Sequence, residues 1–322
     1  MKRILSLVLI ISILLGCQPR QDPLSQKEFC LDTVVRITLY DSDSKNILNK
    51  CFDLCRKYEL IFSNTNTSSE LYKVNHDPLK TSYQPISKDL AHIIEQGLYY
   101  SQLSKGAFDI TIGSISSLWD FKSNHPSLPD ASLIKKNLSN VSYTNVICHD
   151  QKILYKNKET MIDLGAIAKG YIADQIKSYL LKKHISSALI NLGGNILCVG
   201  NKNGNPFTIG ITDPKKTNSS IIRIEAQDQS IVTSGIYQRN MTINKHFYHH
   251  ILDPHTGYSY NNDLASVTIL SPTSTQGDAL STVCFSLGLD EGLKLIDSMK
   301  GIEACFIDKN NHITYSKNFK HL

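Results

Sequence analysis

The chain has 322 residues, of which 41% are hydrophobic and 20% charged, and its formal net charge is +5. These values are typical of a globular protein with one large domain or two small ones. The chain contains no basic block and no stripe of alternating basic and aromatic residues, so we expect no nucleic acid as a partner.

The N-terminal segment MKRILSLVLIISILLGC carries two basic residues and an apolar run that ends at Leu15. This run is short for a membrane span and is typical of a signal peptide. Leu14-Leu15-Gly16-Cys17 resembles the bacterial lipobox, whose cysteine is lipidated and becomes the new N-terminus; the alternative is a plain signal peptide with a chance cysteine. We expect a signal peptide at 1–16, a lipidated tether at 17–28 and a folded domain at 29–322. The protein would then be a bacterial lipoprotein on the periplasmic or extracytoplasmic face of a cell membrane, with the inner membrane as the first choice.

Seven further cysteines follow Cys17, and an odd number cannot all pair. No C-x-x-C spacing of a zinc or redox site occurs among them. We therefore expect buried thiols that behave as small hydrophobic residues.

The pattern of apolar residues predicts the elements in chain order. A strand at 34–40 precedes a helix at 45–62, a second helix capped by Asp89 ends at 105–106, and a loop at 123–132 leads into a short helix. Short strands then surround a helix at 166–184, and two helices (276–287 and 290–299) precede a closing hairpin (303–307 with 312–315). Because strands and helices do not alternate strictly, the fold class is α+β with mostly antiparallel sheet. The predicted strands are 152–156, 187–192, 196–199, 207–212, 220–225, 230–233, the hairpin 241–252 turning at Asn244-Lys245, and 264–270.

The segment GAFDITIG (106–113) places two polar residues in an otherwise apolar stretch. If the segment is buried, Asp109 and Thr111 must be hydrogen-bonded, because an unpaired buried polar group costs roughly 2–7 kcal/mol.

Two glycine-containing segments could approach a ligand closely. In DLGAIAKGY (163–171) a strand ends and a helix begins near Ala166, which offers free N–H groups and the positive end of a dipole to a phosphate. Lys169 would add charge there, although Asp163 could equally be a simple helix cap. In INLGGN (190–195), Gly193 and Gly194 either line a ligand or merely build a hairpin turn.

Three later segments carry side chains that could bind a ligand or take part in catalysis. Arg239 in SGIYQR could pair with phosphate or with a carboxylate, and His250 in HHILDPHTG lies just before a rigid Asp-Pro turn. His249 faces the other side of the strand, where we expect solvent. In GDALST, Asp278 and Thr282 are spaced i, i+4 and share a helix face, where they could bind a hard cation such as Mg²⁺; the alternative is a helix cap with a back-bonded threonine.

In order, the chain reads FDIT, DLGAIAKGY, NLGGN, SGIYQR, HILDPHTG and DALST behind a lipobox. This series resembles the ApbE family of FAD:protein FMN transferases from about residue 30 to 305. The resemblance implies a single ApbE-like domain, related to the T-fold, with a flavin cleft between sub-regions. It also implies an enzyme that uses FAD as substrate, releases AMP, and attaches FMN through a phosphoester to a threonine or serine of a carrier protein.

The resemblance implies a role for each matching residue. His250 is the general base, and Mg²⁺ is held by Asp278, Thr282 and the Ala166 carbonyl. The implied carrier is a subunit of a membrane redox complex with a D-x-x-T-x-A-T-like acceptor. The residues expected near FAD are Leu31, Ala107, Phe108, Asp109, Asp163, Lys169, Gly193, Gly194 and Ile251.

Three departures from the family pattern stand out. Leu31-Asp32-Thr33 replaces the usual Met-Gly-Thr, the segment SNTNTSSE (63–70) lacks an expected aromatic ring, and Ser281 replaces an acidic residue that some members have beside the metal. Two alternatives remain open at this point. One is an FAD pyrophosphatase that uses water as the acceptor, and the other is a lipid-anchored flavin-binding protein without turnover.

Overall fold

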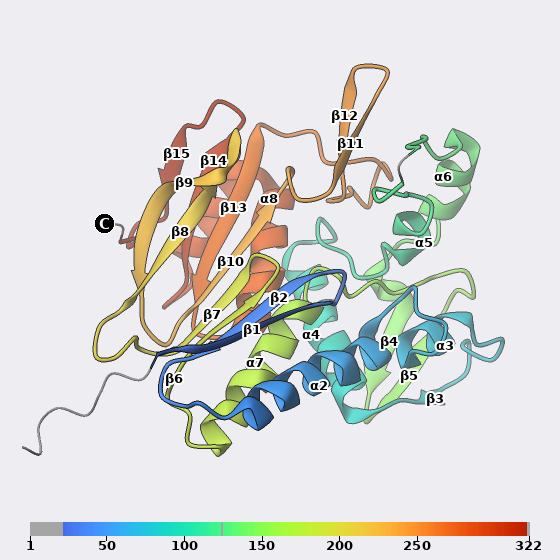
Figure 1. Cartoon of the computed structure of the whole chain (residues 1–322). Helices are drawn as coiled ribbons and strands as arrows, with labels where there is room; N and C mark the ends of the chain where they lie inside the picture. Colours follow the sequence, from blue (N-terminus) through green and yellow to red (C-terminus); the bar gives the residue numbers. More distant parts are fainter. Residues whose placement is uncertain (1–21, 124, 321–322) are drawn as a thin grey trace, which may run out of the picture.

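An eight-stranded antiparallel sheet organises the chain (Figure 1). The computed structural model describes residues 22–123 and 125–320, so the predicted signal peptide and Cys17 lie outside the described residues. The N-terminal hairpin forms one edge of the sheet and the C-terminal hairpin forms the other. In spatial order the strands are β1 (Leu24–Cys30), β2 (Thr33–Leu39), β6 (Ser187–Leu192), β7 (Asn195–Gly200), β10 (Ser230–Gly235), β13 (Leu264–Ser271), β14 (Glu303–Asp308) and β15 (Ile313–Tyr315).

Helices cover one face of this sheet. The helices α2 (Lys45–Phe62), α7 (Ala168–Lys182) and α8 (Ser274–Asp297) pack on the strands, and α4 (Lys88–Leu103) packs against α2 and α8. Their apolar faces meet alternate residues of the strands, such as Ile37 and Ile190, in the largest hydrophobic core. Burial of this apolar area is the main favourable term in folding.

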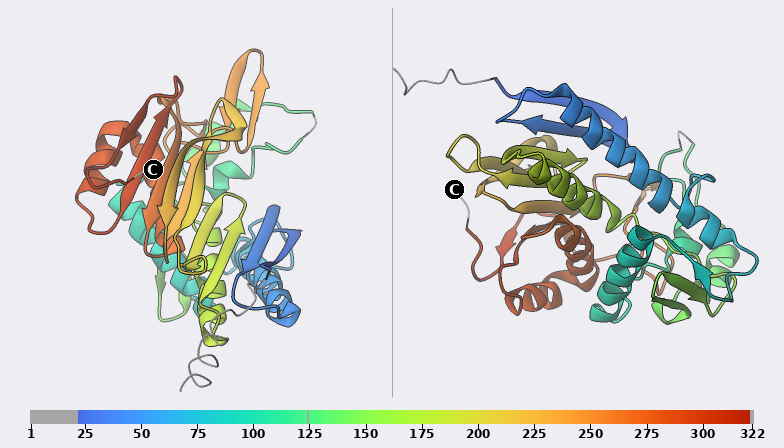
Figure 2. Two further views of the ribbon diagram at one scale, coloured as in Figure 1. Left: turned by 60° about the vertical axis from the view of Figure 1, so that its left-hand side comes forward. Right: turned by 90° about the horizontal axis from the view of Figure 1, so that it is seen from below.

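A long hairpin covers part of the opposite face, as the turned view in Figure 2 shows. Its strands are β8 (Phe207–Asp213) and β9 (Lys216–Ala226). Side chains of this hairpin, such as Phe207 and Ile224, pack on Ile231 and Leu270 of the main sheet in a second core. The sheet is therefore sandwiched at its centre and open over β1 and β2, where Phe29 and Val34 are exposed.

A smaller sub-region lies beside the helical layer. A third core joins Ile115 and Trp119 to Ile134, Met241 and Leu252, which come from segments far apart in the chain. The elements of the sub-region are α3 (Glu70–His76), β3 (Gln84–Pro85), α5 (Gly113–Ser116), α6 (Ala131–Leu138), η1 (Tyr143–Asn145), β4 (Val146–His149), β5 (Lys152–Tyr155), and the hairpin β11 (Asn240–Ile243) with β12 (His246–His249).

The predicted α+β class with mostly antiparallel strands is confirmed. The helix 45–62 and the strand 187–192 have the predicted bounds, and the hairpin 241–252 turns at Asn244-Lys245, both of which have positive φ. The two predicted closing helices lie within α8, and the break expected between them is confirmed, because the backbone leaves the helical conformation at Gly288, whose φ is 78°.

Two expectations about local structure are wrong. The ordered fold begins before residue 29, because β1 starts at Leu24 and pairs with β2 along its whole length. The cap of α4 is Ser87, whose hydroxyl accepts from the Leu90 N–H. Asp89 lies in the first turn instead, where it accepts a hydrogen bond from the Tyr171 hydroxyl and pairs with Lys57.

The cysteines of the described chain are free thiols, and all but Cys148 are buried, as expected. Within residues 22–123 and 125–320, the helices are too short or too polar to cross a membrane.

Candidate functional site

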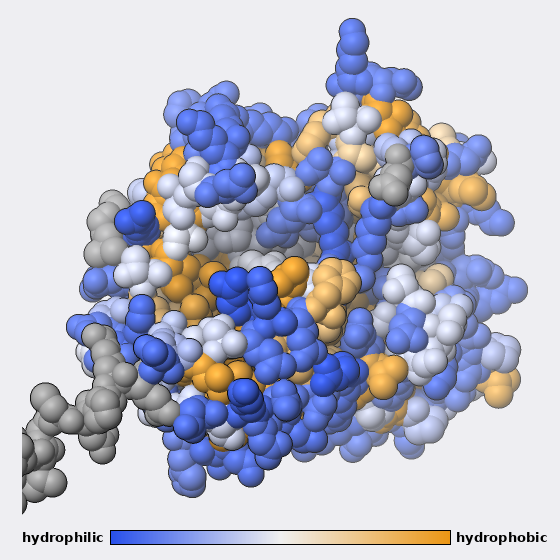
Figure 3. Space-filling model, viewed as in Figure 1, coloured by the Kyte–Doolittle hydropathy of each residue, from blue (hydrophilic) through white to orange (hydrophobic). Residues whose placement is uncertain are grey.

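A cavity of about 770 Å³ lies where the tip of the β1–β2 hairpin, the starts of α7 and α8, and the smaller sub-region meet. Figure 3 shows the hollow near the centre of this face, with hydrophilic side chains around it and a small apolar patch over the hairpin tip. The volume is in the upper part of the range of small-molecule sites. Its position fits the expected cleft between sub-regions.

Nearly all the predicted site residues lie in the walls of this one cavity, although they come from six separate parts of the chain. Gly194 is the exception among the described residues, since only its neighbour Gly193 lines the cavity. The residues brought together are Leu31, Ala107, Phe108, Asp109, Asp163, Ala166, Lys169, Gly193, His250, Ile251, Asp278 and Thr282.

Asp109 shapes the wall of the cavity. Its Oδ1 accepts from the Thr111 hydroxyl at 2.6 Å and from the Thr111 N–H at 2.8 Å, and its Oδ2 accepts from the Tyr143 N–H at 2.7 Å. The expected hydrogen bonding of the Asp109–Thr111 pair is therefore confirmed. Burial raises the pKa of the Asp109 carboxyl above its ordinary value. With both oxygens engaged, the side chain holds the segment 107–111 in place.

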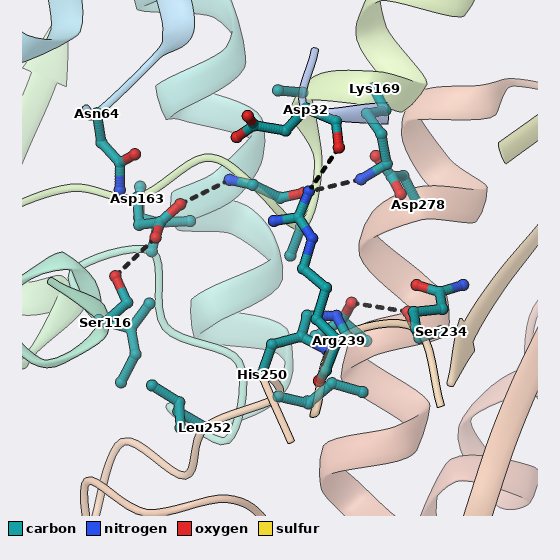
Figure 4. A pocket seen from close by; sticks show the side chains of 18 of the residues that line it. Asp32, Asn64, Ser116, Asp163, Lys169, Ser234, Arg239, His250, Leu252 and Asp278 are labelled. Atoms are coloured by element: carbon teal, nitrogen blue, oxygen red, sulfur yellow. Dashed lines mark hydrogen bonds between the residues drawn. The ribbon is translucent and has the colours of Figure 1, made fainter. Parts of the chain in front are cut away.

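Asp163 is held in a similar way at the turn before α7. Its Oδ1 accepts from the Gly165 N–H at 2.8 Å, and its Oδ2 accepts from the Ser116 hydroxyl at 2.7 Å. Figure 4 shows Asn64 beside this carboxylate, on the same side of the cavity. Each carboxylate oxygen has a second lone pair, so a ligand with N–H or O–H donors can still bind here.

Two cations face the cavity with only backbone partners in the described part of the chain. Lys169 Nζ donates to the Gly165 carbonyl at 3.2 Å, and Arg239 Nη2 donates to the Asp32 carbonyl at 3.3 Å (Figure 4). In the described residues neither charge has a salt bridge to a carboxylate, so both groups are available to an anion, although carboxylates such as Asp163 and Asp278 also line the cavity. A guanidinium and an ammonium together are well suited to the oxygens of a phosphate.

The rim of the cavity includes the two-residue turn of the β1–β2 hairpin. Leu31 and Asp32 both have positive φ, 54° and 60°, the conformation that a tight hairpin turn requires. Asp32 replaces the expected family glycine and pairs with Lys122 at 2.7 Å across the rim. On the other side of the turn, a Cβ on Gly193 would lie 2.1 Å from Thr33 Oγ1, so close approach requires this glycine.

Three oxygen atoms with unused capacity line the deeper part of the cavity. Gly170 N–H donates to Asp278 Oδ2 at 2.8 Å rather than to the Ala166 carbonyl four residues earlier, so that carbonyl has no partner among the described residues. Asp278 Oδ1 likewise has no hydrogen-bond partner among the described residues. The third oxygen is Thr282 Oγ1, whose recorded contact is with the Ser234 hydroxyl at 3.1 Å.

These three donors fit a hard divalent cation. Mg²⁺ prefers oxygen ligands and usually takes one or two carboxylates, with water and substrate phosphate completing the shell. In the described ranges no group of three or more His, Cys, Asp or Glu side chains could hold a metal. The residues that could hold the cation here are Ala166, Asp278 and Thr282, which offer a carbonyl, a carboxylate and a hydroxyl oxygen. The set has one negative charge, which leaves room for an anionic ligand.

His250 is half-buried in the cavity wall, and its tautomer follows from its contacts. Nδ1 lies 3.2 Å from the Arg239 carbonyl, which can only accept, so Nδ1 carries the proton and Nε2 keeps its lone pair. Desolvation, reinforced by the charges of Arg239 and Lys169, lowers the pKa of His250 to about 3. An ordinary imidazole has a pKa near 6.5. The free protein therefore holds a neutral ring that is a weaker base than an ordinary imidazole.

The prediction for His249 is wrong. The side chain is buried rather than solvated, with Nε2 3.0 Å from the Tyr260 carbonyl and its ring edge-on to Phe285. Burial lowers the pKa of His249 to about 4. The strand ends at this residue, so the alternation that predicted an outward-facing side chain does not continue.

A family model described as "ApbE family" matches residues 31–306, most of the chain. The chain belongs to the ApbE family. It is 32% identical over 285 residues to the FAD:protein FMN transferase of Klebsiella pneumoniae, covering 88% of each sequence. It is 30% identical over 322 residues to the protein of the same name from Treponema pallidum, covering 94% of this chain and 89% of that one.

Solved structures agree with this membership. The crystal structure of the ApbE protein of Thermotoga maritima matches with a TM-score of 0.85 and 28% identity, over 92% of this chain and 98% of that chain. As a member of this family the chain is an enzyme, a transferase. The predicted single ApbE-like domain is confirmed.

Several residues of this ApbE-family site escaped the sequence analysis. Ser116, at the end of α5, and Lys122, in the loop that follows, show no recognisable pattern in the sequence, and Asp32 was noted only as a departure. Trp119 carried a usable signal, because it is the sole tryptophan of the sequence. In the structure it stacks on Phe121 with centroids 5.3 Å apart, and both rings line the cavity.

Proposed function

We propose that this enzyme is an FAD:protein FMN transferase that moves FMN from FAD to a threonine or serine hydroxyl of a carrier protein and releases AMP. Family membership supports the reaction class. The observation that carries the proposal for this chain is the neutral His250, with Nε2 free, in the same cavity as the oxygens of Asp278 and Thr282. A base beside a site for a cation and an anion is the minimum for phosphoryl transfer to a hydroxyl.

FAD binds in the cavity with its pyrophosphate near the cationic side chains of Lys169 and Arg239. Asp163 accepts hydrogen bonds from a heterocycle or ribose. Apolar ring systems find flat surfaces in the walls, which are built partly from Tyr58, Phe62, Phe108, Trp119 and Phe121. Aromatic side chains provide large contact areas with defined stacking geometry.

Asp278, Thr282 and the Ala166 carbonyl hold Mg²⁺. When bound there, Mg²⁺ neutralises charge on the pyrophosphate and stabilises the leaving AMP. Asp278 supplies the charge and Thr282 a neutral oxygen, while Gly170 N–H keeps the carboxylate oriented. Lys169 and Arg239 add positive charge near the pyrophosphate, and neither of them bonds to the three oxygens that hold the cation.

His250 Nε2 accepts the proton of the carrier hydroxyl as its oxygen attacks the phosphorus of the FMN half of FAD. The new P–O bond forms while the bond to the bridging oxygen breaks, and AMP leaves with the electron pair. The pKa of about 3 describes the protein without substrate. A bound pyrophosphate offsets the charges of Arg239 and Lys169, which removes two of the smaller causes of the low pKa, while desolvation, the largest cause, remains.

Hydrolysis of FAD to FMN and AMP is a second candidate activity. The segment Ser63-Asn64-Thr65 lines the cavity with small polar side chains where the family pattern leads us to expect an aromatic ring. Small polar groups leave room for water near the reacting phosphate. The same base and cation site then serve water instead of a carrier hydroxyl.

The carrier and the location follow from the same proposal. We propose a membrane redox complex subunit with a D-x-x-T-x-A-T-like acceptor, since a lipid on Cys17 would confine the enzyme to the surface of a cell membrane. The extracytoplasmic face is the side on which lipidated signal-peptide cysteines remain.

The test incubates the full chain, purified in detergent, with FAD, Mg²⁺ and a carrier domain that bears such an acceptor. Flavin fluorescence in the gel and the intact mass of the carrier measure transfer. Wild type should add one FMN, whereas Asp278→Ala and His250→Ala should not. His246→Ala is the matched control, because His246 is an exposed histidine of the neighbouring hairpin.

The outcomes separate the candidates. Conversion of FAD to FMN and AMP with an unmodified carrier makes hydrolysis the function. FAD binding without any turnover refutes both enzymatic candidates and leaves a flavin-binding protein.

A further inference from the structure

Three hydroxyl groups form a short chain beside the proposed cation site. Ser234, on β10, has its Oγ 2.8 Å from Ser281 Oγ and 3.1 Å from Thr282 Oγ1, both on α8. Ser281 Oγ in turn lies 2.9 Å from the Asp278 carbonyl oxygen. The strand and the helix are therefore joined by hydroxyls next to Asp278 and Thr282.

The carbonyl at the end of the chain fixes the direction of every proton in it. A carbonyl oxygen can only accept, so the proton of Ser281 points to Asp278 O. Ser234 must then donate to Ser281, because Ser281 has no second proton. Because Ser234 has used its only proton on Ser281, Thr282 must donate its proton to Ser234.

This order leaves Thr282 Oγ1 with its lone pairs unused and its proton engaged by Ser234 Oγ. A helical threonine commonly donates to the carbonyl four residues earlier, which here is Asp278 O. Ser281 occupies that carbonyl, and Ser234 offers the alternative acceptor. The oxygen of Thr282 therefore presents lone pairs, rather than a proton, to whatever lies in the cavity.

We propose that Ser234 is a positioning residue for the cation site, and that Ser281 acts with it as the final proton donor of the chain. This inference rests on the proposed function, in which Thr282 is a ligand of Mg²⁺. Ser281 thus contributes through hydrogen-bond direction at a position where some family members carry an acidic residue. Partners that orient a metal ligand typically affect metal affinity 10–100-fold when removed.

The experiment measures the binding of Mn²⁺, as a probe for the divalent cation, to the full chain in detergent without FAD. Titration followed by electron paramagnetic resonance of free Mn²⁺ gives the dissociation constant independently of turnover. Ser234→Ala should weaken binding about 10–100-fold, because the Thr282 proton must then turn toward the site. Ser234→Thr keeps the hydroxyl and should restore the wild-type dissociation constant within about threefold.

Ser281→Ala gives the sharper test, because the hydroxyl of Ser281 bonds to Ser234 and to the Asp278 carbonyl and not to the Thr282 hydroxyl. Without Ser281 as acceptor, Ser234 can donate to Thr282, so the Thr282 proton is displaced toward the cavity. Weaker Mn²⁺ binding by Ser281→Ala, of the same order as for Ser234→Ala, is therefore expected. A merely structural serine would not produce this effect.

Thr268→Val is the matched control. It removes a hydroxyl that does not itself line the cavity, from a 2.8 Å pair with Thr233 in the same sheet. Its Mn²⁺ affinity should equal that of wild type. If wild type binds Mn²⁺ and both serine variants bind it equally well, the inference is overturned while the proposed function stands. If wild type and Asp278→Ala bind Mn²⁺ equally, the proposed cation site itself is wrong.

Discussion

The Oδ2 atom of Asp278, on α8, accepts a hydrogen bond of 2.8 Å from the backbone N–H of Gly170, in the first turn of α7. A carboxylate at this position stabilises the positive end of the α7 dipole. The same bond takes Gly170 N–H away from the Ala166 carbonyl, which leaves that oxygen available to a cation. One contact between two helices thus orients the carboxylate and frees a second ligand.

Asp278→Asn should separate the structural role of this residue from its chemical role. The amide oxygen can still accept from Gly170 N–H, so the free energy of unfolding should stay within about 1 kcal/mol of wild type. FMN transfer should fall at least about 100-fold, since the negative ligand of the cation is lost. Urea unfolding and single-turnover transfer measure the two effects. If this variant transferred FMN at the wild-type rate, Asp278 would not be a metal ligand.

Gly170→Ala should destabilise the fold, although alanine normally favours a helix over glycine by about 1 kcal/mol. A Cβ at this position would lie 2.2 Å from the Ser274 carbonyl oxygen, a backbone atom at the start of α8. We expect a net loss of about 1–3 kcal/mol in urea unfolding, the usual cost of overpacking. Ser178→Ala, on the same helix, is the control and should change stability by less than about 0.5 kcal/mol. A stabilised Gly170→Ala would contradict the close packing of α7 on α8.

The stability of the protein should fall as the pH drops below about 6.5, the ordinary pKa of histidine. The folded state lowers the pKa of His249 to about 4 and that of His250 to about 3, so both rings stay neutral where the unfolded chain binds protons. Because the unfolded state then holds more protons, stability decreases from pH 6.5 toward pH 4.

Urea unfolding at pH 7.5 and 5.0 measures this loss. The double variant His249→Gln/His250→Gln should show a smaller difference between the two pH values than wild type. Carboxyls such as Asp109, whose pKa burial raises, contribute equally to both proteins and cancel in the comparison. An unchanged difference would mean that the two rings are not kept neutral by the fold.

Cys17→Ser should release the mature protein from the membrane if the lipobox is used. Fractionation of cells that produce the full chain should place wild type in the membrane pellet and the variant largely in the supernatant or as uncleaved precursor. Cys148→Ser, at a partly buried thiol of the folded domain, is the control and should leave the distribution unchanged. A variant that stays in the membrane with a cleaved leader would exclude lipid anchoring at Cys17.

Elements with a clear apolar period could be predicted from the sequence, and edge elements could not. The helix 45–62 has one continuous apolar face, which gave its bounds correctly. β1 has polar residues on both faces. On the face toward α2, Gln26 bonds to Asn49 and Glu28 accepts from Arg56. Its strand conformation depends on pairing with β2, and no local pattern encodes that pairing.

The site shows the same division. The i, i+4 spacing of Asp278 and Thr282 on one helix placed both at the cavity, and the family pattern supplied His250. The partners that set proton positions lie outside the local segment: Ser234 is on β10, and the carbonyl that orients His250 belongs to Arg239, on the other side of the β11–β12 hairpin. Such relationships depend on tertiary packing. The failure at His249 has the same cause, because its orientation is set where the strand ends against Tyr260 and Phe285.

The early start of β1 limits how far this enzyme can work from a lipid bilayer. If Cys17 is lipidated, only six residues separate it from Leu24, and a fully extended chain covers at most about 25 Å over the seven Cα-to-Cα steps between them. β1 adds roughly 23 Å before its turn reaches the rim of the cavity. The acceptor hydroxyl must therefore come within about 50 Å of the lipid surface. This height restriction selects integral or closely attached proteins, whatever their sequence, over acceptors that diffuse in the surrounding aqueous compartment.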